Sequence, residues 1–271
     1  SPMTDYIELS YLDLAFAALL VLFNAGLSLA LGLGLERRML LAALRMTVQL
    51  LLVGLVLEAL FQTVSLWLTA LVALVMVLFA GREILARQER RLAGWWGYGI
   101  GATNMLLAGM VVTLLALGGP LRPEPPDLSP WFDPRYAIPL FGMILGNAMT
   151  GISLGLDSLT TMVGRERAGI EAQLLLGANR WRAMRTVARQ ALRTGFTPML
   201  NSMAAAGVVF LPGMMTGQIL AGVAPEQAVK YQILLLFLIA GATGLGVLGA
   251  VMASVWRLTD DRHRLRLDRL K

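Results

Sequence analysis

The sequence contains no cysteine, a single histidine and few charged residues. Of its 271 residues, 15% are charged and 57% are hydrophobic. The lack of cysteine excludes disulfide bonds and thiolate metal sites. A soluble domain of this composition would expose large apolar patches to water. The composition therefore predicts a membrane protein.

Lysine is almost absent as well. Only Lys230 and Lys271 occur, and neither follows a glycine, whereas a P-loop requires Gly-Lys followed by Ser or Thr. Any ATP that drives this chain must therefore be bound by a separate subunit. Because the sole histidine, His263, follows the last apolar run, a metal site within the membrane would need oxygen or thioether ligands. The sequence leaves the ligands of such a site unknown.

Seven apolar runs are long enough to cross a membrane, which takes about 20 residues. The predicted spans are 11–35, 39–61, 64–80, 98–117, 137–156, 197–220 and 231–255. The expected fold class is all-α, a polytopic membrane protein of about seven transmembrane helices. We expect a single transmembrane permease domain over residues 1–271, with one cytoplasmic amphipathic segment at 158–196.

The 23 basic residues are distributed unevenly along the chain. All but Arg45, Arg122, Arg135 and Lys230 follow the first, third, fifth and seventh spans. By the positive-inside rule, we expect the N-terminus outside and the C-terminus in the cytoplasm, in a multi-pass protein of the cell inner (plasma) membrane. The net charge of +6 then reflects topology and contact with membrane lipids, and we expect no nucleic-acid partner, since no module of that class is visible.

The stretch from residue 211 to 233 is unusual for a helix that faces lipid. Pro212 removes a backbone donor, and Gly213 and Gly217 loosen the helix that follows. Thr216 and Gln218 add polar side chains. Such irregular backbone is tolerated in hydrocarbon only where it is buried in protein or lines a cavity. We therefore predict a helix break that faces a partner helix or a translocation route.

Residues 165–195 carry small or apolar residues at helical spacing, with arginines on a neighbouring face. This pattern is typical of a basic amphipathic helix at the inner membrane surface. Gly177, Ala178 and Asn179 interrupt it, and because Gly and Asn accept left-handed backbone at helix ends, we predict a turn there. Two interpretations stay open: a peripheral helix without a partner, and a docking element for another subunit.

Polar residues inside the predicted spans are candidates for function because each is costly in lipid. Five residues of the fifth span recur at helical spacing and share one face: Gly142, Gly146, Thr150, Ser153 and Asp157. The small residues favour helix packing, whereas Asp157 could attract a cation or cap the helix end. The predicted substrate path consists of Asn147, Asp157, Met215, Thr216 and Gln218.

The motif Pro-Gly-Met-Met-Thr-Gly-Gln-Ile-Leu at 212–220, followed by Ala-Val-Lys-Tyr-Gln-Ile at 228–233, resembles the membrane subunits of FetB-type iron-export ABC transporters. The motif Glu-Ala-Gln-Leu-Leu-Leu-Gly at 171–177 resembles the Glu-Ala-Ala loop of ABC permeases. Here Gln173 stands at the third position of that loop, where the family has Ala. Through that loop the resemblance implies ATPase coupling by five residues: Glu171, Ala172, Gly177, Arg180 and Trp181.

The resemblance further implies a permease homodimer with two ATP-binding cassette subunits, which hold ATP and Mg²⁺, so that this chain carries no cofactor and is not itself an enzyme. The implied function is export of iron or another metal cation. Some plant relatives are associated with aluminium tolerance and sugar-nucleotide movement, which leaves the substrate open. The other interpretations are a scaffold or regulator of an ATPase, and an ion-driven transporter. The separated positions of Glu58 and Asp157 count against the last of these.

Overall fold

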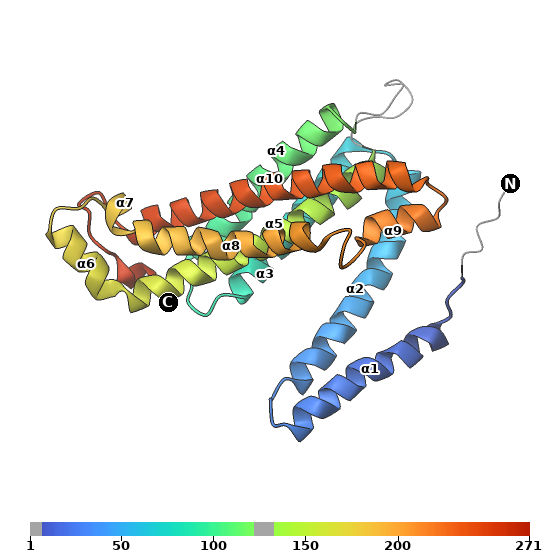
Figure 1. The fold of residues 1–271 in the computed structure, drawn as a ribbon, viewed down its shortest axis with the longest axis horizontal. Coiled ribbons are helices and arrows are strands. Elements are labelled where there is room, and N and C mark those ends of the chain that lie inside the picture. The colour runs from blue at the N-terminus through green and yellow to red at the C-terminus, as the bar shows by residue number, and fades with distance from the viewer. Residues whose placement is uncertain (1–6, 122–132) are drawn as a thin grey trace. The chain divides into compact units, whose positions relative to one another are not determined.

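The computed structural model describes residues 7–121 and 133–271, and the regular secondary structure of these residues is helical apart from isolated bridges. The helices in chain order are α1 (Tyr11–Ala30), α2 (Glu36–Gln62), α3 (Leu66–Ala86), α4 (Trp95–Gly118), α5 (Pro134–Arg165), α6 (Arg167–Leu175), α7 (Arg180–Ala183), α8 (Arg185–Ala205), α9 (Gly213–Leu220) and α10 (Pro225–Leu258) (Figure 1). A 3-10 helix, η1, covers Leu267–Arg269. The predicted all-α membrane fold is confirmed.

Six of these helices are long and apolar enough to cross a membrane: α1, α2, α3, α4, α5 and α10. The sixth predicted span, 197–220, is wrong as a continuous helix. Its first part belongs to α8, which already begins at Arg185, and its last part is the separate helix α9. Between them Gly207 has a φ of +84°, and its amide donates to the Phe210 carbonyl (2.8 Å). A left-handed residue ends an α-helix because the hydrogen-bond ladder cannot continue through it.

The described residues divide into two compact units. The first holds α1 and α2, joined by a turn in which Gly32 and Gly34 have positive φ. The Ser28 hydroxyl ties the two helices together because it donates to Glu36 Oε2 (2.8 Å) and accepts from the Leu35 amide (2.9 Å). The second unit holds α3 to α8 and α10, together with most of α9.

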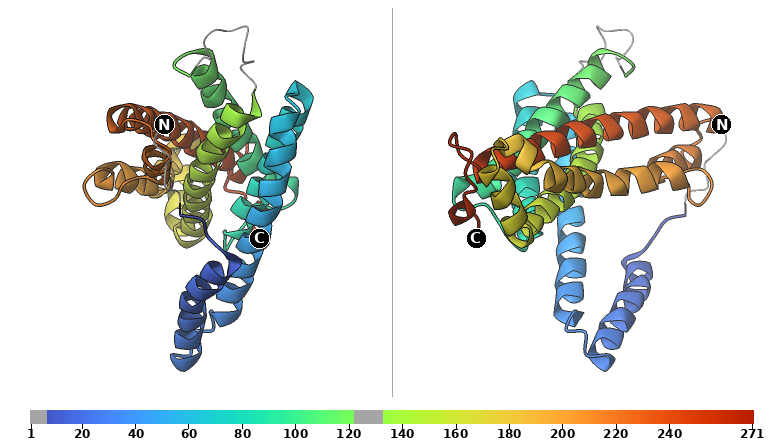
Figure 2. Two further views of the ribbon diagram at one scale, coloured as in Figure 1. Left: turned by 90° about the vertical axis from the view of Figure 1, so that its right-hand side faces the viewer. Right: turned by 60° about the vertical axis from the view of Figure 1, so that its left-hand side comes forward.

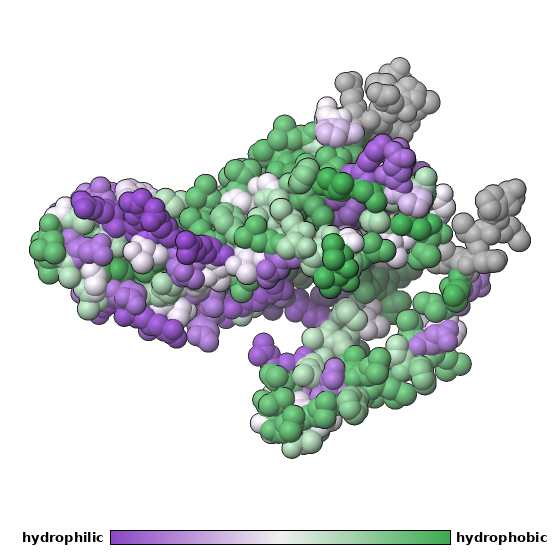
Figure 3. All heavy atoms as spheres, in the orientation of Figure 1, coloured by the Kyte–Doolittle hydropathy of each residue, from purple (hydrophilic) through white to green (hydrophobic). Residues whose placement is uncertain are grey.

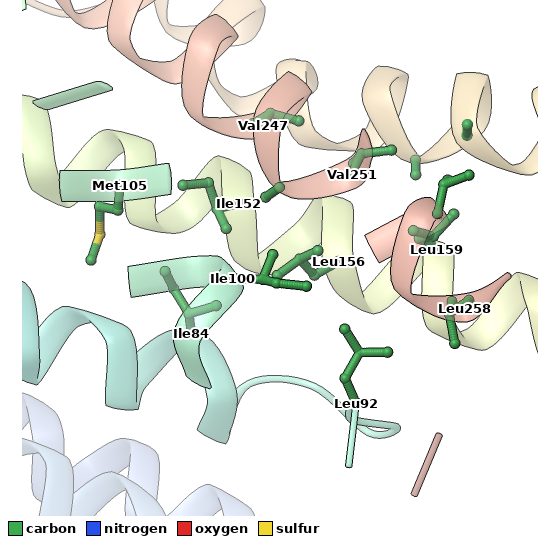
Figure 4. Close-up of a cluster of buried hydrophobic side chains, with 14 of the residues drawn as sticks. Ile84, Leu92, Ile100, Met105, Ile152, Leu156, Leu159, Val247, Val251 and Leu258 are labelled. Atoms are coloured by element: carbon green, nitrogen blue, oxygen red, sulfur yellow. The ribbon is translucent and has the colours of Figure 1, made fainter. Parts of the chain in front are cut away.

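The second unit is built around α5, which packs against α3, α4, α8 and α10. Figure 2 shows α8 and α10 lying side by side in both views. The core between these helices is mainly aliphatic: Ile152 and Leu156 of α5 meet Val247 and Val251 of α10, with Ile84 of α3 alongside (Figure 4). Within a bilayer such packing is stabilised by van der Waals contact, because the lipid tails are as apolar as these side chains.

Three helices of this unit approach one another through glycine. A methyl group on Gly195 of α8 would lie 2.6 Å from Val247 Cγ1 and 2.9 Å from the Gly151 carbonyl oxygen. A methyl group on Gly155 would lie 3.3 Å from Val247 Cγ1. The backbones of α5 and α8 can therefore touch only because these positions lack a side chain. This close contact holds the first half of α8 firmly against the end of α5.

The predicted segment 158–196 includes the ends of two long helices. Helix α5 continues to Arg165 and α8 starts at Arg185, so residues 166–184 lie between these two helices. The extensions are stabilised because Leu159 and Val163 of α5 and Val187 of α8 are buried in the main core. Figure 1 shows α6, α7 and the C-terminus gathered at one end of the bundle and α9 at the other. We call the former the basic end, made of residues 87–94, 166–184 and 259–271.

Candidate functional site

The segment between α5 and α8 is a short helix with a defined turn. Helix α6 ends at Leu175, and Gly177 follows with a φ of +91°. The Ala178 amide donates to the Gln173 carbonyl (3.0 Å) and the Gly177 amide to the Leu174 carbonyl (3.1 Å). This pair of bonds is a Schellman motif, which satisfies carbonyls at a helix end. The turn predicted at Gly177-Ala178-Asn179 is therefore present, and Asn179 caps α7 by accepting from the Arg182 amide (2.9 Å).

The tip of α6 presents apolar side chains to the outside. Ile170 is buried and Leu174 packs on the core, so these two residues anchor the helix. Leu175 and Leu176, by contrast, are 88% and 89% exposed. A contiguous pair of exposed apolar side chains on an ordered turn is a candidate contact surface for another protein or for a membrane. This pair cannot be recognised from the sequence, because helical spacing does not show which leucines of the run 174–176 stay uncovered in the fold.

The five predicted coupling residues fall into two groups. Ala172, Gly177 and Trp181 lie on the surface. Glu171 and Arg180 instead form ion pairs within the chain. Glu171 Oε1 accepts from Arg167 Nε (3.0 Å), and Arg180 Nη2 donates to Asp261 Oδ1 (2.8 Å). Glu171 and Arg180 therefore shape the segment, while the other three are available for contact.

The C-terminal residues connect this segment with the α3–α4 loop. The backbone amide of Arg180 donates to His263 Nδ1 (3.3 Å). Further along, Lys271 and Arg91 exchange two backbone hydrogen bonds (2.6 and 2.8 Å), and the Ala93 amide donates to the Arg269 carbonyl (2.7 Å). The tail, residues 259–271, thus binds two loops of the basic end at once and orders both.

Arg266 and Asp268 stabilise the tail locally. Arg266 donates from Nε to Asp268 Oδ1 (3.0 Å) and from Nη2 to Oδ2 (2.9 Å). These hydrogen bonds lower the pKa of the Asp268 carboxyl, and the same contact raises the pKa of Arg266. A bidentate ion pair of this kind fixes the relative orientation of the two side chains better than a single hydrogen bond does.

Asp157 lies towards the C-terminal end of α5, and one of its two carboxylate oxygens accepts a hydrogen bond from a neighbouring loop. Its Oδ1 accepts from the Glu89 amide of the α3–α4 loop (2.9 Å), so it ties that loop to α5 across 68 positions of sequence. The carboxylate also lines a cavity of about 120 Å³ with Arg87, Thr150, Ser153 and Leu154. The side chain therefore caps a neighbouring loop and still faces an open space.

The other predicted path residues lie elsewhere. Asn147 is exposed on α5, and its Nδ2 donates to the Met143 carbonyl (2.8 Å). Met215, Thr216 and Gln218 are half-buried on α9, and in the described residues Gln218 Oε1 is buried without a hydrogen-bond partner. None of these four lines the Asp157 cavity. The structure therefore brings Asp157 together with hydroxyls of α5 but does not gather the predicted path into that cavity.

The predicted break residues border the interruption and do not kink a continuous helix. Helix α9 begins at Gly213, directly after Pro212, and the Pro212 carbonyl accepts from the Thr216 amide (3.1 Å). Pro212 thus stands at a helix start, where a missing N–H has no consequence. Gly217 lies within α9. Between α8 and α9 the residue with a positive φ is Gly207, which was not among the predicted break residues.

The small-residue face predicted on α5 is divided by the structure. Ser153 is buried and donates to the Met149 carbonyl (2.6 Å), whereas Gly146 has open space beside it. A methyl group on Gly142 would lie 3.2 Å from Met76 Cε, while the contacts of α5 with α8 and α10 use Gly151 and Gly155. A stripe of side chains on α5 stays exposed or half-buried: Asn147, Thr150, Leu154, Asp157, Ser158 and Thr161. We call it the α5 polar stripe.

No metal-binding cluster stands out. Within residues 7–121 and 133–271, no group of three or more His, Asp or Glu side chains is placed to hold a metal ion. A metal that passed along the α5 polar stripe would meet hydroxyl, amide and single carboxylate oxygens. Such ligands bind weakly compared with a dedicated cage.

Comparison with known proteins places the chain in a family of membrane proteins. The model of the uncharacterised protein family UPF0014 matches residues 11–258. The chain is 34% identical to "UPF0014 membrane protein slr1647" of Synechocystis, over 95% of this chain and 96% of the relative. It is 31% identical to "Probable iron export permease protein FetB" of Escherichia coli, over 96% of each chain. It is 36% identical to "UPF0014 membrane protein STAR2" of rice, over 84% and 76% respectively. No solved structure gives a significant match.

Proposed function

The chain belongs to the UPF0014 family of membrane proteins, and from that premise we propose that it is the permease subunit of an ABC transporter in the cell inner membrane. A separate subunit binds ATP and Mg²⁺ and hydrolyses the nucleotide. The proposed cargo is iron or another metal cation, in line with the relative named a probable iron export permease. The cargo is a substrate and does not reside in the protein.

One observation carries the proposal: an ordered helical turn projects two exposed leucines at the basic end. Leu175 is the last residue of α6 and Leu176 follows it. Ile170 anchors this helix in the core shared by α5 and α8. Because α5 and α8 are locked together at Gly151 and Gly195, a force on α6 is transmitted to two long helices. A rigid, apolar contact of this kind suits a coupling element that an ATPase grips and moves.

The α5 polar stripe supports the transport half of the proposal. Polar side chains in the hydrocarbon region must face protein or water, because each unsatisfied group costs several kcal/mol, as an order of magnitude. We propose that a second copy of the chain faces this stripe and that the route lies between them. Asn147 and Asp157 then contact the cargo, with Met215, Thr216 and Gln218 nearer the α9 end. Weak oxygen ligands favour release over storage.

The coupling half is tested with the ATP-binding subunit that co-purifies from native membranes and is identified by its P-loop. Leu175→Ser combined with Leu176→Ser should weaken binding of that subunit about tenfold or more, because it removes two exposed apolar side chains that the interface would bury. The control is Gln173→Ser, an exposed position on the same helix. If the leucine double variant binds the subunit and supports stimulated ATPase activity like wild type, α6 is not the coupling element.

The transport half is tested by metal-stimulated ATPase activity of the reconstituted complex. Gln218→Leu and Asn147→Leu should lower the stimulation by Fe²⁺ while basal turnover and assembly stay unchanged. A scaffold without transport activity would show no metal stimulation in the wild type. Unchanged stimulation in both variants, with Gln218→Cys unlabelled from either side, would place the route elsewhere.

The proposed orientation has the basic end in the cytoplasm. The chain has no native cysteine, so single cysteines report sidedness without background. Arg264→Cys should resist an impermeant reagent in intact cells, and Ala224→Cys, between α9 and α10, should react. The opposite pattern would reverse the topology.

A further inference from the structure

A tryptophan and arginine cluster lies where α4 begins and α10 ends. The rings of Trp96 and Trp256 are 5.7 Å apart between centroids and inclined by 54°. The Arg257 guanidinium carbon lies 4.6 Å from the centre of the Trp96 ring. A guanidinium held against an aromatic face at this distance is a favourable cation–π contact. The cluster therefore holds one arginine in a fixed orientation.

A second guanidinium reaches the same turn of α10. Arg269 Nη1 donates to the Arg257 carbonyl (2.9 Å), which brings the tail's arginine next to Arg257. The neighbouring carboxylate, Asp268, is already occupied at both oxygens by Arg266. Among the described residues neither Arg257 nor Arg269 forms an ion pair, and Arg257 Nε is buried without an acceptor. The site has positive charge that the chain itself does not neutralise.

The surroundings place this charge at the boundary between lipid and water. Trp95 is 86% exposed, and Trp96 and Trp256 are exposed as well; tryptophan concentrates at membrane interfaces because its ring is apolar and its N–H is polar. Leu248, Met252 and Trp256 recur every four residues on the exposed side of α10. Figure 3 shows apolar residues over α4 and the middle of α10, with hydrophilic residues at the basic end and again where α10 begins. An apolar track therefore runs along α10 up to the arginines.

We propose that Arg257 and Arg269 bind the phosphate of an anionic phospholipid whose acyl chain lies along Met252 and Leu248. Two guanidinium groups match the several acceptor oxygens of a phosphate, and the planar fork suits them better than a point charge. The track on α10 accounts for the acyl chain, which a free phosphate does not need. Anionic lipid is also the class that basic groups at this leaflet attract.

The bound lipid would connect α10 to the tail. Arg269 belongs to the residues that pair with Ala93, and the same tail holds Arg180 through Asp261. Lipid binding therefore orders the tail and, through it, the α6–α7 turn. This inference does not depend on the cargo or on an ATPase partner, so it stands or fails separately from the proposed transport function.

The first test counts lipids retained by the purified chain in native mass spectrometry after reconstitution in equal amounts of phosphatidylglycerol and phosphatidylcholine. Wild type should retain phosphatidylglycerol in preference by roughly tenfold. Arg257→Gln combined with Arg269→Gln should abolish the preference. The control, Arg185→Gln with Arg262→Gln, removes the same charge at exposed positions and should keep it. Equal retention by the two double variants would overturn the proposal, and so would displacement of the lipid by excess inorganic phosphate, which would indicate a site for a free anion.

A second test needs no arginine variant and so cannot be confused with misfolding. Phosphatidylglycerol with brominated acyl chains should quench the tryptophan fluorescence of wild type more than brominated phosphatidylcholine at the same mole fraction. The difference should disappear in Trp96→Phe combined with Trp256→Phe, and persist in Trp67→Phe. Equal quenching of wild type by the two lipids would contradict an anionic lipid at this site.

Discussion

The α5–α8–α10 crossing and the α6–α7 segment both depend on glycine, but for different physical reasons. At the crossing, Gly151, Gly155 and Gly195 have ordinary helical backbone, and a side chain there would meet neighbouring atoms. At the α6 end, Gly177 has open space around it but a φ of +91°. The first region needs the missing volume and the second needs the backbone freedom. Substitutions that add side-chain volume should therefore disrupt the crossing, whereas substitutions that disfavour a positive φ should disrupt the α6 end.

The largest effect is expected at the crossing. Gly195→Leu places a side chain where a methyl group would already lie 2.6 Å from Val247 Cγ1, and overpacking of this extent costs about 3 kcal/mol or more. The thermal unfolding temperature of the detergent-solubilised chain should fall sharply. Gly241→Leu on α10, which has open space beside it, should leave that temperature nearly unchanged.

A compensating variant sharpens this prediction. Gly195→Ala combined with Val247→Ala removes the clash with the valine while keeping the added methyl group, and it should unfold at a higher temperature than Gly195→Ala alone. If both variants unfold at the same temperature, the contact with Val247 does not set the separation of α8 from α10.

Much of the fold follows from the sequence, because apolar runs and arginine-rich loops are properties of single segments. The turn at Gly177 was predicted for the same reason, since Gly-Ala-Asn is a local signal for the end of a helix. The break near Gly207 was not, because nothing in the sequence marks one glycine of many as left-handed. The face of α5 that meets α8 was not identified from the sequence: helical spacing groups Gly142 with Gly146 and Gly151 with Gly155 equally well, and only the position of α8 decides between them.

The next largest effect is expected at Gly177. A β-branched residue is strained at positive φ, so Gly177→Val should cost about 2 kcal/mol locally and distort the α6 end. Global unfolding temperature should change little, while binding of the ATP-binding subunit should fall. Gly177→Asn is the matched control because Asn tolerates left-handed backbone, and it should bind nearly normally. Equal losses in both variants would mean that side-chain volume at this position matters more than backbone conformation.

A smaller effect is expected where the tail meets the turn. Asp261→Asn removes the ion pair with Arg180, which as a surface pair contributes less than about 1 kcal/mol. Hydrogen exchange of residues 176–184 should become faster, with no change in α5 or α8. Arg262→Gln, beside it on the tail, should leave this exchange unchanged. Faster exchange throughout the bundle would show that the tail supports the whole fold, contrary to a local tie.

The smallest effect concerns acidity. The pKa of Asp268 is lowered by its hydrogen bonds from Arg266, so the pair stabilises the tail at and above the ordinary pKa of Asp, about 3.9, and this contribution is lost as the pH falls through the lowered value. A spin label on Arg262→Cys should therefore keep the same mobility from pH 7 to about pH 5 and become more mobile only below about pH 4. The same label in Asp268→Asn should lack this acid transition because the titrating group is gone. If the acid transition persists in Asp268→Asn, the hydrogen bonds from Arg266 to Asp268 are not the acid-sensitive contact of the tail.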